Sequence, residues 1–160
     1  MNTTGGEGIL TALALILPLA VAPRAAFLHA QESHPGLEES MKRHTEAWNA
    51  HNVETLIQLY DPDAAFLTFP GGDEVMRGRR QIGERLRAHF VNHPDLRTQV
   101  LSRIISDNLV FEHEELTGLR KDPRQPGTTT LRGVTIYQLR RGMIQRVWLV
   151  NAEETGEESR

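Results

Sequence analysis

Cysteine is absent from this 160-residue chain, which excludes disulfides, thiolate catalysis and Cys-ligated zinc or iron–sulfur centres. Blocks of basic residues are also absent and the formal net charge is −3, so the chain has no electrostatic footprint for nucleic acid. The most apolar stretch, Ile9 to Ala22, covers fourteen residues and is too short to span a bilayer comfortably. The length fits one domain with one core. No nucleic-acid partner is expected.

Residues 1–30 are typical of a secretory signal peptide. The apolar stretch is followed by small residues and a cleavage point after Ala30, although the segment before it contains Glu7 and no Lys or Arg. We expect cleavage and export to the periplasm or the medium. An uncleaved anchor and a misplaced start codon are the alternatives, and a membrane is a partner only if the leader is retained. A linker at 31–36, a domain at 37–151 and an acidic tail at 152–160 complete the expected organisation.

Apolar residues at helical spacing come first in the domain. They predict a helix from Leu37 to about His51, and a second helix after Asn52 that includes Tyr60 and stops at Asp61-Pro62. A third helix around Ile82 to Phe90 should end before Pro94. Strands are expected at 64–69, 74–77, 96–106, 109–117, 131–140 and 143–151.

The last two expected strands carry apolar residues on both faces. In the first, Leu131, Tyr137 and Leu139 share one face, opposite Val134 and Ile136. In the second, Val147 and Leu149 oppose Ile144, Trp148 and Val150. A half-exposed strand would alternate apolar and polar residues, so this pattern predicts a sheet covered on both sides, by helices and by a second subunit.

Helices followed by antiparallel hairpins indicate an α+β domain. The order of elements, with the segments 48–52, 59–64, 76–79, 93–96, 116–118 and 142–144, resembles the SnoaL-like branch of the nuclear-transport-factor-2-like superfamily. This resemblance implies a cone of three N-terminal helices packed on a strongly curved, mostly antiparallel sheet, with a pocket inside and a homodimer through the convex face. Its relatives include ketosteroid isomerases, polyketide cyclases, limonene epoxide hydrolases and non-catalytic binding or assembly domains, so the fold alone does not settle function.

Glu112 and Glu114 are two residues apart in the strand 109–117 and therefore share one face. Composition alone would turn Leu109 and Phe111 inward and leave both glutamates in water. The superfamily register, counted back from Gly118, instead implies that both glutamates point into the cone, and we follow it. The outer face then gathers an apolar patch that a monomer would not normally expose, made of Phe111, Val134, Ile136, Trp148 and Val150.

Two carboxylates in one enclosed site should repel each other enough to keep one protonated near neutral pH. A carboxylate base beside a carboxylic acid can move a proton next to a carbonyl and stabilise the enolate. His44, on the apolar face of the first helix, is either a core histidine or a pocket donor and acceptor. The catalytic hypothesis therefore combines Glu114, Glu112 and His44. The remaining expected pocket residues are Trp48, Phe66, Thr68, Thr135, Tyr137, Val147 and Asn151.

The chain departs from its active relatives at their functional positions. Where ketosteroid isomerases have a Tyr and two Asp, it has His44, Thr68 and Thr135; where limonene epoxide hydrolases have Asp, Arg and Asp, it has Glu114, Glu112 and Leu149. We therefore do not expect this chain to catalyse either reaction with the residues that those relatives use.

No cofactor is expected and no metal. His89 and His93 are four residues apart, but Pro94 ends the helix and no third ligand follows.

These observations predict an exported SnoaL-like domain that holds a small lipophilic or carbonyl-bearing molecule in its cone. The enzymatic version is a cofactor-independent isomerase, cyclase or lyase. The alternative is a non-catalytic ligand-binding or dimeric assembly module, favoured if the glutamates face solvent or if Trp48, Phe66 and Tyr137 plug the pocket.

Overall fold

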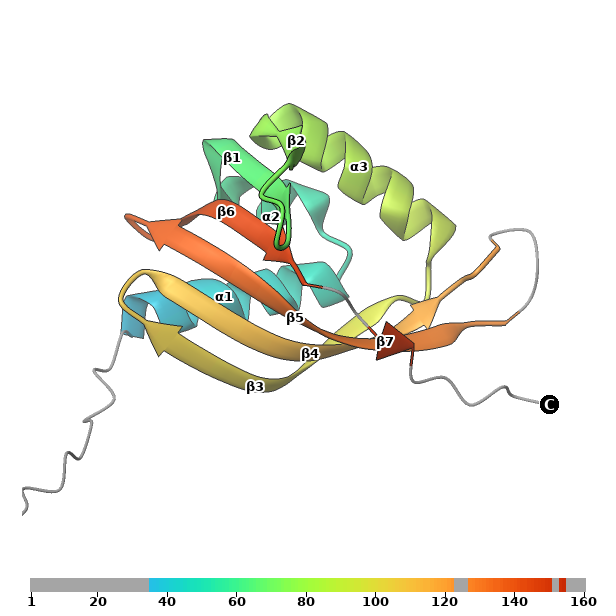
Figure 1. Cartoon of the computed structure of the whole chain (residues 1–160). Coiled ribbons are helices and arrows are strands. Elements are labelled where there is room, and N and C mark those ends of the chain that lie inside the picture. The colour runs from blue at the N-terminus through green and yellow to red at the C-terminus, as the bar shows by residue number, and fades with distance from the viewer. Residues whose placement is uncertain (1–34, 123–126, 151–152, 155–160) are drawn as a thin grey trace, which may run out of the picture. The chain divides into compact units, whose positions relative to one another are not determined.

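The computed structural model describes residues 35–122, 127–150 and 153–154, which lie in one compact unit, Ser33–Arg160 (Figure 1). The predicted leader, Asn151 and most of the acidic tail lie outside the described residues. The elements follow the order α1 (Pro35–Asn49), α2 (Val53–Leu59), β1 (Tyr60–Thr68), β2 (Glu74–Arg77), α3 (Gly78–Asn92), β3 (Arg97–Ser106), β4 (Leu109–Leu119), β5 (Thr129–Arg140), β6 (Met143–Leu149) and β7 (Glu153–Glu154). The predicted α+β class, with three helices on a mostly antiparallel sheet, is confirmed.

The three helices form where the apolar spacing predicts them. In α1 the buried face includes Met41 and His44, and α2 begins at an Asn52 cap whose side-chain oxygen accepts a hydrogen bond from the Thr55 N–H at 3.0 Å. The prediction that Tyr60 belongs to the second helix is wrong. Its backbone is extended at φ −89° and ψ 145°, so it ends α2 and opens β1 just ahead of Asp61-Pro62.

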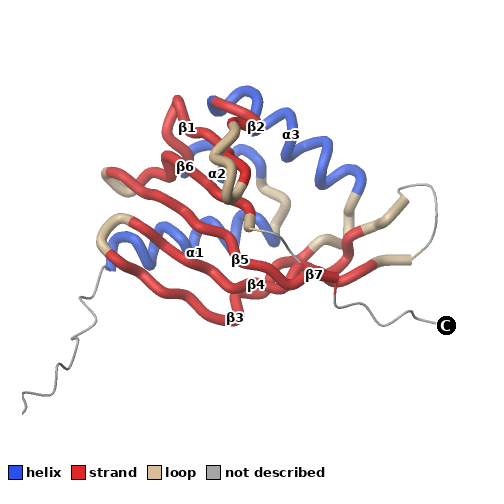
Figure 2. Tube along the Cα trace, in the orientation of Figure 1, coloured by secondary structure: helices blue, strands red, loops and turns tan. Residues whose placement is uncertain are grey.

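The strands form one sheet in the order β2-β1-β6-β5-β4-β3, with β7 added beside β5. Every neighbouring pair is antiparallel except β1 and β6, which run parallel. Figure 2 shows the strand layer with helices gathered along it. Aromatic contacts join the two layers, since the His44 ring of α1 lies 5.3 Å from the Tyr137 ring of β5. Side chains between the helices and the sheet therefore make up the core and the walls of any pocket.

The face assigned to Ile144 from the sequence is wrong. Leu139 pairs with Ile144 and Gln138 with Arg146, so the ladder between β5 and β6 shifts by one residue there. Such a bulge reverses the alternation of side chains along one strand. Ile144 therefore shares the buried side with Val147, and both are 1% exposed.

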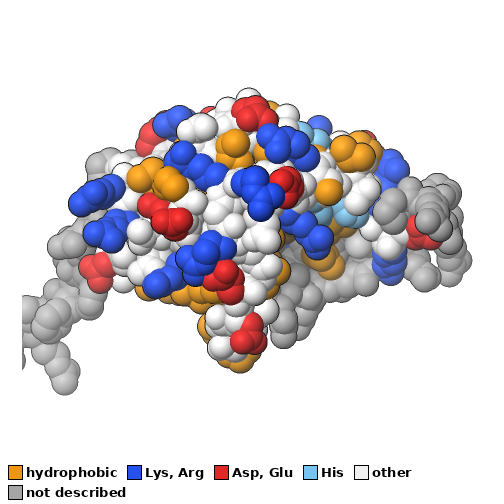
Figure 3. Space-filling view, turned by 90° about the horizontal axis from the view of Figure 1, so that it is seen from above, with side chains coloured by type: hydrophobic (Ala, Val, Ile, Leu, Met, Phe, Trp, Pro, Cys, Tyr) orange, Lys and Arg blue, Asp and Glu red, His pale blue; other side chains and the backbone are white. Residues whose placement is uncertain are grey.

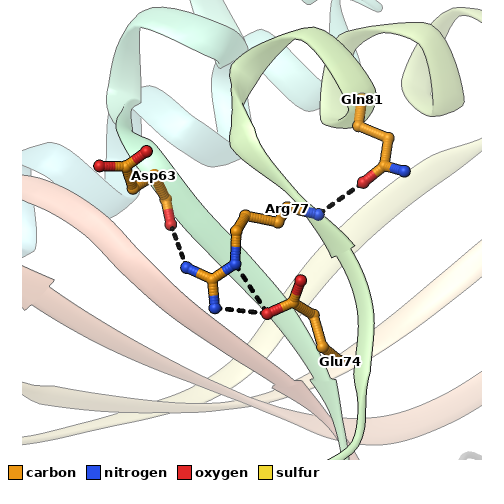
Figure 4. A network of polar contacts seen from close by, with 4 residues as sticks. All are labelled: Asp63, Glu74, Arg77 and Gln81. Atoms are coloured by element: carbon orange, nitrogen blue, oxygen red, sulfur yellow. Dashed lines mark hydrogen bonds and ion pairs between the residues drawn. The ribbon is translucent and has the colours of Figure 1, made fainter.

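The β1–β2 hairpin is fastened to α3 through Arg77 (Figure 4). The Arg77 Nε donates to Glu74 at 2.8 Å, and Nη1 donates to the Asp63 carbonyl at 3.2 Å. Its backbone N–H donates to the Gln81 side chain at 2.7 Å. Because these groups are exposed, the network orients the hairpin more than it stabilises the fold. On the face drawn in Figure 3, basic and acidic side chains are intermingled.

Candidate functional site

A cavity of about 360 Å³ lies between α1 and the inner face of the sheet. Small-molecule sites typically measure roughly 300–1,000 Å³, so this cavity is of ligand size. Eight of the ten residues predicted for the site line it: His44, Trp48, Phe66, Glu112, Glu114, Thr135, Tyr137 and Val147. The cavity exists between Trp48, Phe66 and Tyr137, so these three rings do not plug it.

Glu112 and Glu114 face the cavity from neighbouring inward positions of β4. Their exposed fractions are 1% and 8%, so the inward register holds and the solvent-facing alternative does not. Across the ladders, Glu112 pairs with Arg103 on β3 and Thr135 on β5, whereas Glu114 pairs with Val100 and Gly133. The two acids therefore have different neighbours, although they share one face.

Arg103 provides Glu112 with a cationic partner. Its Nε donates to Glu112 Oε1 at 2.6 Å, and the Arg103 side chain is only 18% exposed. A charge-assisted bond of this kind, largely removed from water, is among the stronger polar contacts in a protein. Arg103 was not predicted from the sequence as a site residue.

Glu114 is held by two hydroxyl groups instead of a cation. Thr98 Oγ1 donates to Glu114 Oε2 at 3.0 Å, and Thr135 Oγ1 donates to Glu114 Oε1. Both hydrogen bonds favour the ionised carboxylate, because an oxygen of the anion is the better acceptor.

Burial changes the proton affinity of both acids. It raises the pKa of Glu112 to about 7, an effect that the nearby Arg103 charge and hydrogen bond oppose and the Glu114 charge reinforces. Burial also raises the pKa of Glu114, against the hydrogen bonds from Thr135 and Thr98 and the charge of Arg103. A carboxyl group that titrates near neutral pH is suited to proton transfer at that pH.

His44 lies across the cavity and shares a hydrogen bond with Tyr60, which was predicted to lie on the second helix. Its Nε2 is 2.9 Å from the Tyr60 hydroxyl, and both residues are buried. Burial, followed by the charge of Arg103, lowers the pKa of His44 to about 4, while burial raises the pKa of Tyr60. At neutral pH the site therefore holds an uncharged imidazole and an uncharged phenol, joined as a donor–acceptor pair.

Thr68 does not line the cavity, contrary to prediction. It is exposed at the end of β1, where its hydroxyl accepts a hydrogen bond from the Asp73 N–H at 3.1 Å within the β1–β2 turn. Asn151 lies outside the described residues. Trp48 lines the cavity, and its Nε1 is buried without a hydrogen-bond partner in the described part of the chain.

Several lining residues were not predicted from the sequence. Tyr60 was expected to lie on a helix, and Thr98 stands between two other polar residues at the start of β3, where nothing in the sequence distinguishes it from them. The other unpredicted residues of the lining are Thr45, Leu116, Leu131, Gly133 and Leu149. Val134 and Val150 also line the cavity, although they were expected in the apolar patch of the outer face. Most of the unpredicted residues lie two or four residues from a predicted inward-facing residue on the same strand. Because alternate residues of a strand face the same side, extending each predicted inward row along its strand would have identified them.

The described residues contain no group of three or more His, Asp or Glu side chains placed to hold a metal ion. The same residues contain no helix long and apolar enough to cross a membrane.

The model of the SnoaL-like domain family matches residues 41–147, about two thirds of the chain, and this range includes every residue that lines the cavity except Leu149 and Val150. The chain belongs to the SnoaL-like domain family. Among curated proteins, none matches it.

Solved structures of other proteins share this SnoaL-like fold. A cystatin-fold protein from Novosphingobium aromaticivorans is 22% identical with a TM-score of 0.65, over 72% of this chain and 97% of its own. A protein from Catenulispora acidiphila with a ketosteroid isomerase-like fold is 18% identical with a TM-score of 0.61, over 71% and 85%. A candidate SnoaL-like polyketide cyclase from Shewanella denitrificans is 16% identical with a TM-score of 0.63, over 74% and 91%. At these identities the likeness establishes the fold alone.

Proposed function

We propose that this SnoaL-like domain binds a small, largely apolar carbonyl compound in its cone and moves a proton at the carbon beside the carbonyl. The observation that supports this most is the pair of buried carboxyl groups on one wall of a ligand-sized cavity, each with a different set of partners. Isomerisation and cyclisation through an enolate both need such a transfer, and neither needs a cofactor.

The partners assign different roles to the two acids. Glu114 acts as the base, because two hydroxyl donors stabilise its ionised form and the positive charge of Arg103 favours the same form. Glu112 acts as the acid, because burial keeps part of its population protonated near neutral pH. In the reaction, Glu114 takes the proton next to the carbonyl while Glu112 donates a hydrogen bond to the oxygen, where the negative charge of the enolate accumulates. In an isomerisation of a β,γ-unsaturated ketone, Glu114 then returns the proton to the γ-carbon of the dienolate, which restores the carboxylate.

His44 and Tyr60 complete the polar lining on the opposite wall. Because the imidazole is uncharged, the pair adds a hydrogen-bonding group without adding a charge to the cone. The rest of the lining is dominated by aromatic and aliphatic side chains, which suits a ligand with an apolar body.

The test uses 3-cyclohexen-1-one, whose conversion to the conjugated enone requires the proposed proton transfer. Wild-type protein should accelerate this conversion, and Glu114→Gln should lower the rate about 100-fold or more while leaving the fold intact. Glu115→Gln is the matched control, since Glu115 neighbours the site on β4 but pairs with Arg132 on the outer face. Full activity in the Glu114→Gln variant would eliminate the assigned base.

A binding or assembly module is the competing function. It predicts no turnover of this enone and a bound molecule that survives purification from the native source. Mass spectrometry of an organic extract of that protein would identify the ligand, and an unaltered ligand together with no proton exchange would favour this second function.

We also propose that the protein is a homodimer through its outer sheet face. One row of directly paired residues runs across five strands there, and all of its members are apolar: Ile104, Phe111, Ile136, Trp148 and Leu67. Ile104 is 61% exposed in the single chain. An apolar row of this length is unfavourable in water and is typical of a surface that pairs with another.

We also propose that the protein is exported, because residues 1–30 have the pattern of a secretory signal peptide. Cleavage after Ala30 would give a mature protein beginning at Gln31, which N-terminal sequencing of the protein from its native host would detect. A mature chain that keeps residues 1–30 would instead support a retained anchor.

A further inference from the structure

The direction of Arg103 depends on an irregularity in β3. Along the β3–β4 ladder, Val100 pairs with Glu114, whereas Ser102 pairs with His113 and Arg103 with Glu112. One extra residue, Leu101, therefore stands in β3 at this point. In an uninterrupted strand, position 103 would lie on the face opposite to Thr98 and Val100.

The bulge places Arg103 on the inner side. Ile104, which would otherwise face inward, is 61% exposed, while the Arg103 side chain is 18% exposed and reaches Glu112. Bulges in sheets frequently re-aim a side chain next to a functional site. Here the re-aimed side chain is the cation that contacts the acid pair.

Arg103 reaches the cavity only indirectly. It is not among the described residues that line the cavity, whereas its partner Glu112 is. Glu112 thus lies between two strands, bonded to the Arg103 guanidinium on β3 and paired in register with Thr135 on β5. A ligand in the cone would contact Glu112, with the guanidinium behind it.

We propose that Arg103 is a positioning residue, turned inward by the bulge at Leu101, that holds Glu112 against β3 and supplies the positive charge that controls its protonation. This inference rests on the proposed function for the role of Glu112, but the interaction itself does not depend on any ligand. The contact of 2.6 Å and the paired register carry the argument.

Other charged or titratable groups also face Glu112. Glu114 is its neighbour on β4, and its negative charge acts against that of Arg103. Tyr60 on β1 and Tyr137 on β5 are uncharged and buried, and the pKa of each is raised in part by the Glu112 charge. His44 on α1 is uncharged above about pH 4. Arg103 is therefore the only cation among the described groups that act on Glu112 near neutral pH.

The test is a ligand-free pH titration of the full chain labelled with ¹³C-glutamate, in which the carboxyl resonances of Glu112 and Glu114 are assigned through their Gln variants. Arg103→Met should raise the midpoint of the Glu112 titration by one to three pH units, because an opposite charge at contact distance lowers an acid pKa by about that much. Arg103→Lys should keep the midpoint within about one unit of wild type. Arg132→Met, which removes the partner of Glu115 on the outer face, is the matched control and should leave it unchanged.

A Glu112 midpoint in Arg103→Met that stays within about 0.3 units of wild type would overturn the proposal. If Arg103→Met does not fold, the double variant Arg103→Met/Glu112→Gln decides the question. Recovery of a cooperative melting transition in the double variant supports action through Glu112, and an equally unfolded double variant refutes it. Both readings are obtained without substrate, so a failed enone assay would count against the proposed reaction and not against this role of Arg103.

Discussion

Glu112→Gln should stabilise the protein, and increasingly so as the pH rises. The folded chain holds the Glu112 proton up to about pH 7, whereas the unfolded chain releases it near the ordinary value of 4.5. Between these two values the folded state binds more protons than the unfolded state, so stability is lost as the pH rises. A Gln at this position never ionises, and its side-chain oxygen can still accept the hydrogen bond from Arg103.

The expected magnitude follows from the width of this window. Each pH unit corresponds to about 1.4 kcal/mol, and the interval from 4.5 to about 7 gives roughly 3 kcal/mol at pH 8. For a domain of this size the gain corresponds to an increase in Tm of about 10 °C. Below pH 4.5 the wild-type carboxyl is protonated in both states, and the two proteins should melt within about 2 °C of each other.

Thermal unfolding followed by circular dichroism from pH 4 to pH 8 measures this difference directly. Glu115→Gln removes the same charge from the outer face of the same strand, where a change within about 1 kcal/mol is expected. A Glu112→Gln variant that is less stable than wild type at pH 8 would show that the ion pair with Arg103 outweighs the cost of burial. A gain of equal size at pH 5 and pH 8 would refute the assigned cause, because the effect must follow the titration.

Four further outcomes are expected from the same structure. Gly118→Ala should cost several kcal/mol in a denaturant titration, because φ is +78° there and a Cβ would lie 2.1 Å from the Asp95 carbonyl oxygen. Gly142→Ala, at φ +76° but with no atom closer than 3.9 Å, should cost only about 1–2 kcal/mol. Ile136→Glu should halve the mass measured by light scattering if the outer face is the dimer interface, and an unchanged mass would exclude this face. The His44 imidazole should remain neutral down to about pH 5 in an NMR titration, since burial lowers its pKa to about 4; protonation near pH 6.5 would contradict the buried hydrogen bond with Tyr60.

The fold was predictable because its signals are local. Apolar spacing identified all three helices, and a short run between two turn segments predicted β2 with its observed bounds, Glu74–Arg77. The order of elements and the segments shared with the family then predicted three helices packed on a mostly antiparallel sheet, and the inward register of Glu112 and Glu114. Composition alone favoured the opposite face, because a carboxylate in a core is rare without a reason that only the surrounding structure supplies.

The chemistry of the site was less predictable because it depends on contacts between distant segments. Glu112 and Arg103 are nine residues apart, and the pair forms only because a bulge reverses the alternation of β3. Tyr60 meets His44 because the chain leaves α2 one residue earlier than the apolar spacing indicated. The spacing of apolar residues does not predict the exact position of a bulge or of a helix end. An error of one residue in the predicted register is therefore enough to place a partner on the wrong face.

Three features that each reduce stability occur together on one wall of the cone. Two acids are buried where an apolar side chain would give a more stable fold, one strand is interrupted by a bulge, and a cavity of about 360 Å³ is left beside them. A structural core would gain from filling that space and removing both charges, and the Glu112→Gln experiment measures part of that gain. Departures from stability that coincide in this way are expected where a protein binds or reacts. The inner wall formed by β3, β4 and β5 is therefore the part of this SnoaL-like domain where a ligand and its chemistry should first be sought.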